Sequence, residues 1–110
     1  MGNSIVIQRP TGRATGSIMA LESTQRAPEL ACRVVAVAGR FARPPRVMPA
    51  ASVHLLHGEQ DAVIPASQSR EAEALLRQLG AVVTADFFPA LGHGIDGRVA
   101  DRVLALLAEP

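Results

Sequence analysis

The stretch from residue 54 to residue 96 most constrains what this chain can fold into. It reads as an apolar strand, an acidic loop, a helix, a second apolar strand and a loop that contains a histidine. The helix is predicted from one apolar stripe at helical spacing, formed by Ala72, Leu75, Leu76 and Leu79. Pro65 fits its first turn, and Gly80 stands where a left-handed C-terminal cap is needed. A strand–helix–strand order predicts two parallel strands whose carboxyl ends meet at one edge of a sheet.

Further apolar segments extend this unit. Residues 33–38 form an unbroken, partly β-branched run, which is typical of a strand buried on both faces of a parallel sheet. Residues 17–22 favour a helix that stops before Pro28. A last helix near the C-terminus has an apolar face made of Val99, Val103, Leu106 and Leu107. The sequence therefore predicts an α/β fold, a parallel sheet with flanking helices.

The first 15 residues differ from the rest. Residues 4–7 are apolar enough for one strand, and a poorly ordered leader is the alternative. We therefore divide the chain into a divergent leader, residues 1–15, and an α/β unit, residues 16–110.

The segment from Phe41 to Ala51 is predicted to be a loop, because three prolines forbid a regular ladder or helix there. Arg40, Arg43 and Arg46 gather in or beside it. A solvated basic loop is the simpler interpretation, and a clamp for an anion or carboxylate is the alternative.

Composition limits the kinds of binding partner and the cellular compartment that we expect for this chain. A chain of 110 residues is one domain at most, and 48% hydrophobic residues supply a core even without Trp or Tyr. A net charge of +1 gives no reason to expect nucleic acid as a partner. No apolar run approaches the length of a membrane span, and the single Cys32 cannot form an internal disulfide. We expect a cytoplasmic protein without stable membrane insertion and without a cofactor.

Asp61 and His93 are the candidate chemical pair. Asp61 follows the first strand of the opening stretch, and His93 follows the second between two glycines. If both loops lie at one sheet edge, the carboxylate can set the tautomer of the imidazole and make it a general base. If the two residues do not form a pair, the simpler interpretation is that Asp61 is an acidic residue at a helix entry and that His93 is a surface histidine.

The other two histidines are the remaining candidates for metal ligands. His54 and His57 lie three residues apart on a strand, so their side chains point to opposite faces. We expect His54 to pack or hydrogen-bond against a helix, and His57 to be a turn residue that supports the acidic loop. No metal site is predicted, because further ligands at usual spacing are lacking.

Three sequence blocks together resemble the carboxylesterase/phospholipase family of α/β-hydrolases. The acid block is residues 57–65 (HGEQDAVIP), and the histidine block is residues 91–95 (LGHGI). Residues 16–23 (GSIMALES) resemble the helix that follows the nucleophile in that family. The resemblance implies the C-terminal half of an α/β-hydrolase fold and hydrolysis of a small ester or acyl substrate by a Ser-His-Asp triad.

The resemblance assigns roles residue by residue. Asp61 becomes the acid and His93 the base, and the G-x-S-x-G nucleophile elbow falls on residues 12–16. Ala14 occupies the position of the nucleophile, and the Thr15 backbone amide that of an oxyanion donor. Ser17 is a less favoured substitute nucleophile, because it lies one turn into the helix. Ala14 thus puts the activity of this chain in doubt.

Family members are about twice as long, so the resemblance implies that the N-terminal half is missing. We expect a truncated hydrolase whose exposed sheet edge makes a homo-oligomer or exchanges elements with a copy. The competing hypothesis is a non-catalytic α/β module that binds acyl ligands or oligomerises.

Overall fold

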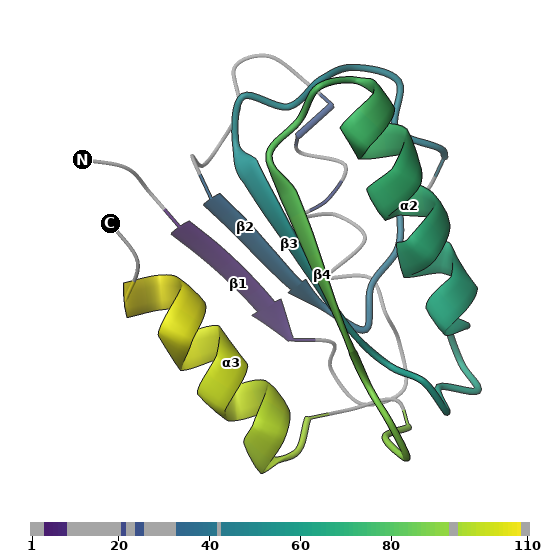
Figure 1. The fold of residues 1–110 in the computed structure, drawn as a ribbon, viewed down its shortest axis with the longest axis vertical. Coiled ribbons are helices and arrows are strands. Elements are labelled where there is room, and N and C mark those ends of the chain that lie inside the picture. Colours follow the sequence, from purple (N-terminus) through teal and green to yellow (C-terminus); the bar gives the residue numbers. More distant parts are fainter. Residues whose placement is uncertain are drawn as a thin grey trace.

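The computed structural model describes residues 4–8, 21, 24–25, 33–41, 43–92 and 95–108. Its centre is a four-stranded sheet in the order β1-β2-β3-β4, in which every neighbouring pair is parallel. The strands are β1 (Ser4–Gln8), β2 (Arg33–Val37), β3 (Ser52–Gly58) and β4 (Val83–Phe88). The helices α2 (Ala66–Gln78) and α3 (Gly97–Ala108) lie on either side of this sheet (Figure 1). The predicted α/β class with a parallel sheet is confirmed.

The strand alternative for the N-terminal segment is the one observed. β1 pairs along its whole length with β2, with Ile5 opposite Val34 and Gln8 opposite Val37. It is the edge strand of the described sheet, next to which no further strand is described. The chain therefore places its N-terminal strand beside β2, on the side away from β3.

The apolar strands β2 and β3 divide their side chains between two cores. On one face Val34, Ala36, Val53 and Leu55 pack with residues of α2. On the other face Val35, Val37 and Leu56 pack with residues of α3. Because successive side chains in a strand point to opposite faces, the unbroken apolar run was needed to fill both cores.

Helix α2 matches its prediction closely. Ala72 and Leu76 are buried in the core, and Leu75 and Leu79 are half-buried at the margins of the same stripe. Pro65 precedes the first helical residue, and Gly80 takes a φ of 90° after the last turn. That left-handed conformation is available to glycine without a steric penalty.

Helix α3 matches its prediction only in part. Val99 and Leu106 are buried, and Val103 packs against them. Leu107 was expected to face the core, but it is 40% exposed, and Leu104 is 66% exposed. The expectation for Leu107 was wrong, because Leu107 is turned about 100° from Leu106 around the helix axis. Arg33 donates to the Leu106 carbonyl (2.8 Å) and Arg102 to Asp86 (2.8 Å), two contacts that help to hold α3 in this orientation.

The helix predicted over residues 17–22 falls mostly outside the described residues. Leu21 is described, and it is helical and fully buried against the α2 side of the sheet. Among the residues that the structure describes, no helix has the length and hydrophobicity to cross a bilayer.

Candidate functional site

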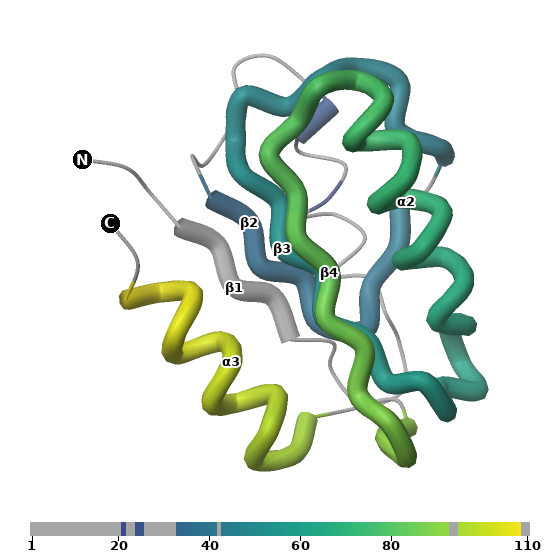
Figure 2. The backbone as a smooth tube through the Cα atoms, in the orientation of Figure 1, coloured from purple at the N-terminus to yellow at the C-terminus, as the bar shows by residue number. Residues whose placement is uncertain are grey.

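Two loops follow neighbouring strands at the same end of the sheet (Figure 2). We call residues 59–65, between β3 and α2, the acid loop, and residues 89–96, between β4 and α3, the histidine loop. β3 and β4 are paired up to their last residues, Gly58 and Phe88. The two loops therefore leave the sheet side by side, as the sequence predicted from parallel strands.

Backbone hydrogen bonds join the two loops. The Glu59 amide donates to the Phe88 carbonyl (3.0 Å), and the Gln60 amide donates to the Leu91 carbonyl (2.9 Å). Gly58 is required for this approach, because a Cβ at that position would lie 2.3 Å from the Leu91 oxygen and 2.4 Å from the Gly92 oxygen. The first part of the histidine loop thus lies directly against the acid loop.

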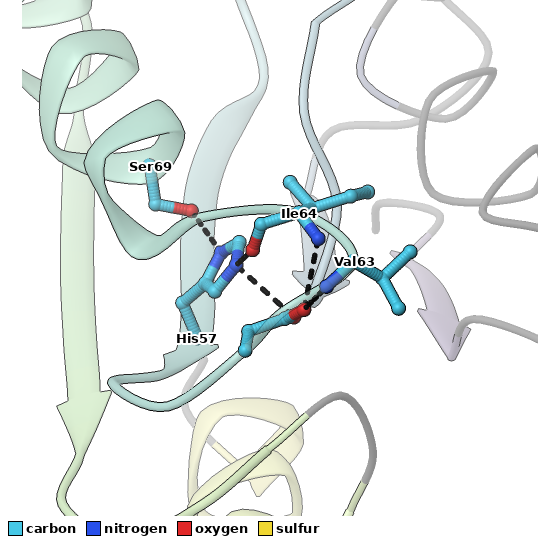
Figure 3. Close-up of polar contacts among 5 residues, drawn as sticks. His57, Val63, Ile64 and Ser69 are labelled. Carbon is cyan, nitrogen blue, oxygen red and sulfur yellow. Dashed lines mark hydrogen bonds and ion pairs between the residues drawn. The ribbon is translucent and has the colours of Figure 1, made fainter.

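Asp61 is held in place by the backbone of its own loop. Its side chain is buried, and one carboxylate oxygen, Oδ1, accepts hydrogen bonds from the amides of Val63 and Ile64, both at 2.8 Å. Figure 3 shows these two amides directed at the same oxygen. Two backbone donors to one oxygen favour the ionised carboxylate and fix the orientation of its plane.

His57 also contacts this loop. Its Nε2 lies 2.6 Å from the Ile64 carbonyl oxygen and 3.3 Å from Asp61 Oδ2, and its Nδ1 lies 2.7 Å from the Ser69 hydroxyl on α2 (Figure 3). Support of the acid loop by His57 is confirmed. The predicted turn position is wrong, because β3 continues through His57 to Gly58.

His54 lies on the opposite face of β3, as predicted. Its hydrogen-bond partner is the Thr84 hydroxyl on β4 (2.7 Å) rather than a helix. The reason is the parallel pairing of the two strands, which sets His54 and Thr84 opposite each other. Within the described part of the chain, no three His, Cys, Asp or Glu side chains gather as a metal site would require.

The remaining predicted site residues lie outside the described residues. They are the base His93, the nucleophile position Ala14, the oxyanion position Thr15 and the substitute Ser17. Gly92 is described, and a Cβ built on it would lie 4.0 Å from the Gln60 carbonyl oxygen. The residue before His93 is therefore close to the backbone of the acid loop.

Asp96 is a structural residue of this edge that sequence reasoning did not identify. Its Oδ1 accepts from the Val99 amide (3.1 Å) at the start of α3, and its Oδ2 pairs with Arg98 (2.7 Å). The hydrogen bond from Arg98, followed by that from the Val99 amide, lowers the pKa of Asp96. An Asp immediately before an apolar helical pattern is the signal that could have identified it.

The arginine-rich loop borders a surface hollow of about 280 Å³ beside α2, lined by residues that include Arg40, Arg43 and Glu71. Arg43 and Arg46 are exposed, and Arg46 donates to the Arg43 and Pro44 carbonyls, both at 3.0 Å. These contacts favour the solvated-loop interpretation. Gln25, which sequence reasoning missed, accepts hydrogen bonds from the amides of Arg46 and Val47 and so holds the loop.

Comparison with known proteins identifies the family. The family model for phospholipase/carboxylesterase matches residues 3–108. The chain belongs to this family. Esterase YpfH of Escherichia coli (strain K12) is 42% identical over 88 residues, which are 79% of this chain and 38% of that protein. The chain thus spans well under half the length of this relative.

Solved structures agree with this assignment. The crystal structure of esterase PE8 superimposes with a TM-score of 0.74 at 30% identity, over 84% of this chain and 45% of that one. Arabidopsis thaliana SOBER1 gives a TM-score of 0.74 over 93% of this chain and 50% of its own, and its 17% identity speaks for the fold alone. The predicted α/β-hydrolase fold and the predicted family are confirmed.

Proposed function

We propose that this chain carries the acid and the base of a carboxylic ester hydrolase, with Asp61 as the acid and His93 as the base. The observation that supports this proposal is the joining of the two loops. Asp61 is fixed by two backbone amides, and the acid loop donates a backbone hydrogen bond to Leu91, two residues before His93. An aspartate that orients a triad histidine needs this kind of rigid, buried setting.

The chemistry divides between the two side chains. Asp61 accepts the Nδ1 hydrogen of His93 and so leaves the other ring nitrogen free to take a proton. In a serine hydrolase that proton comes from the nucleophile, whose oxygen attacks the ester carbonyl, and it is then delivered to the departing alcohol. Water hydrolyses the acyl intermediate by the same route, so the acid and the base are regenerated.

The nucleophile is the weak part of this triad. Ala14 stands at the position that the family implies for serine, and a methyl group cannot attack a carbonyl. With the Thr15 amide as an oxyanion donor, His93 can still activate water, and a serine hydrolase without its triad retains roughly 10³–10⁴-fold acceleration over water. Ser17 remains a less favoured substitute. Truncation of the hydrolase stays a prediction.

Restoring the nucleophile tests the proposal. We expect slow hydrolysis of a short-chain nitrophenyl ester by the chain itself and a rise of several orders of magnitude in Ala14→Ser, since a catalytic serine contributes up to about 10⁶-fold. Ala14→Ser should also react with a fluorophosphonate probe, and His93→Ala should abolish both gains. If turnover in Ala14→Ser survives His93→Ala, the base assignment is wrong. Ser17→Ala in the original chain is the control for a substitute nucleophile.

A non-catalytic, oligomerising module is the second candidate. It is favoured by β1 at the edge of the described sheet and by the exposed Leu104 and Leu107 on α3. A homo-oligomer that covers these features should appear as a mass above one chain in light scattering. Leu104→Glu should reduce that mass, whereas Val82→Glu, which also replaces an exposed apolar residue, should not. A monomer at high concentration would count against the candidate.

A further inference from the structure

The ring of His57 is buried, with both nitrogens engaged. His57 is 1% exposed, and its nearest polar partners come from two different elements, Ser69 on α2 and Ile64 in the acid loop. A buried polar ring of this kind is stable only when its hydrogen bonds are satisfied. His57 thus links β3, α2 and the acid loop at one point.

The partners of His57 fix its tautomer. The Ile64 carbonyl can only accept, so Nε2, at 2.6 Å from it, must carry the hydrogen. In the neutral ring Nδ1 is then an acceptor, and the Ser69 hydroxyl at 2.7 Å must donate to it. With the ring neutral, hydrogen bonds run in one direction, from Ser69 through the ring to the backbone of the acid loop.

Ile64 connects this relay to the acid. Its amide donates to Asp61 Oδ1 (2.8 Å), and its carbonyl accepts from His57. Nε2 of the same ring also lies 3.3 Å from the second oxygen of Asp61. The carboxylate is thus constrained on Oδ1 by the loop backbone and near Oδ2 by the ring (Figure 3). Losing the ring would release the Ile64 carbonyl and so loosen the residue whose amide donates to Asp61.

We propose that His57, locked by Ser69, is a positioning residue that holds Asp61 in the orientation in which it meets the base. This inference rests on the proposed function, because it takes Asp61 as the acid of the site. It assigns a role in the proposed ester hydrolase to two buried side chains.

The test measures the pKa of the His93 ring by NMR titration in the full chain. An ionised Asp61 beside His93 raises that pKa, so Asp61→Asn should lower it by about 1. His57→Leu should lower the pKa of His93 nearly as far, although Asp61 is still present. His57→Gln should restore most of it, because the amide of Gln can donate to Ile64 in place of Nε2.

The matched control is His54→Leu. It removes another buried histidine from the same strand but leaves the acid loop untouched, so the pKa of His93 should not change. Ser69→Ala is the milder variant if His57→Leu fails to fold. It should lower the pKa of His93 by a smaller amount. Long-range ¹⁵N–¹H spectra should show the Nε2–H tautomer of His57 in the original chain and also in Ser69→Ala, because the Ile64 carbonyl that requires it is unchanged.

The outcomes separate the two proposals. If Asp61→Asn leaves the pKa of His93 unchanged, the acid–base pair of the proposed function is wrong. If Asp61→Asn lowers it but His57→Leu and Ser69→Ala do not, the pair stands and the positioning role is overturned. An Nδ1–H tautomer of His57 in the original chain would also show that the proposed hydrogen bonds from Ser69 to His57 and from His57 to Ile64 are wrong.

Discussion

The two histidines of β3 are both buried, but they connect different elements of the fold. His54, in the middle of the strand, hydrogen-bonds to Thr84 and so links two strands that are already paired along their length. His57, near the carboxyl end, hydrogen-bonds to α2 and to the acid loop. Neither of these elements is paired with β3 by the backbone hydrogen bonds of the sheet. Both rings are at most 5% exposed. Burial therefore does not distinguish the two histidines, whereas the elements that each ring connects do.

This contrast explains why the carboxyl end of β3 is the sensitive part of the strand. Loops lack the repeated backbone hydrogen bonds of a sheet, so a few contacts decide their conformation. At this end Gly58, His57 and Asp61 supply those contacts. Four substitutions, from the largest expected effect to the smallest, test whether the stability of the fold is more sensitive to changes at the carboxyl end of β3 than elsewhere.

Gly58→Ala should have the largest effect. Its new Cβ would meet two backbone carbonyls of the histidine loop at 2.3 and 2.4 Å, which cannot rotate away as a flexible side chain would. We expect the free energy of unfolding to fall by about 3 kcal/mol in urea denaturation. Gly97→Ala is the control, because no atom lies within 4 Å of a Cβ there, and it should be neutral or stabilising by about 0.5 kcal/mol. Equal effects of both would refute the close approach of the loops.

His57→Leu should follow, with a loss of about 2–3 kcal/mol. The substitution removes one donor and one acceptor and leaves the buried Ile64 carbonyl without its hydrogen bond from the ring. His54→Leu should cost about 1 kcal/mol, because its partner Thr84 is only half-buried and can turn toward solvent. Urea denaturation of both variants measures the difference. A larger loss in His54→Leu would reverse the comparison between the two histidines.

Ser69→Ala should be milder than His57→Leu. It removes the donor to Nδ1 but leaves the hydrogen bond from the ring to Ile64, so we expect a loss of about 1 kcal/mol. Thr84→Val, the equivalent change beside His54, should cost less, about 0.5 kcal/mol. Thermal unfolding resolves the order of the two. If Thr84→Val is the more damaging variant, the link to α2 is less important than the link between strands.

Asp96→Asn should have the smallest effect and depend on pH. The pKa of Asp96 is lowered in the folded chain, chiefly by Arg98, so its charge stabilises the fold above the ordinary pKa of 3.8. That contribution is lost as the pH falls through the lowered value. The original chain should therefore melt slightly higher than Asp96→Asn at pH 6, and the two should converge in strong acid. A difference that persists at pH 2 would contradict the electrostatic origin.

Much of the fold could be predicted because it depends on short patterns. The unbroken run at residues 33–38 predicted a strand covered on both faces, and both cores are present. The stripe on α2 and the cap at Gly80 followed from helical spacing and from the conformational freedom of glycine. The prediction for Leu107 was wrong because periodicity gives the width of an apolar face but not the rotation of α3 about its own axis. That rotation depends on contacts with the sheet, including those of Arg33 and Arg102.

The candidate site could be predicted only in outline. Asp61 stood out because it follows a strand and precedes a helix, and the pairing of β3 with β4 explains why its loop lies beside the histidine loop. The role of Ser69 could not be read from the sequence. Nothing in its spacing of twelve residues from His57 indicates a hydrogen bond, since that contact depends on how α2 packs back onto β3.

By itself, the sequence determined the order of strands and helices and the membership of a hydrolase family, and it singled out Asp61 as a candidate acid, because these inferences depend on periodicity and on local motifs. Tertiary structure alone decided the approach of the two loops at Gly58, the ring tautomer of His57 and the exposure of Leu104 and Leu107. The physical reason is that hydrogen bonds and packing between distant segments depend on distance in space. The number of residues between two segments does not give their distance in space, which is set only when the sheet and helices have packed together.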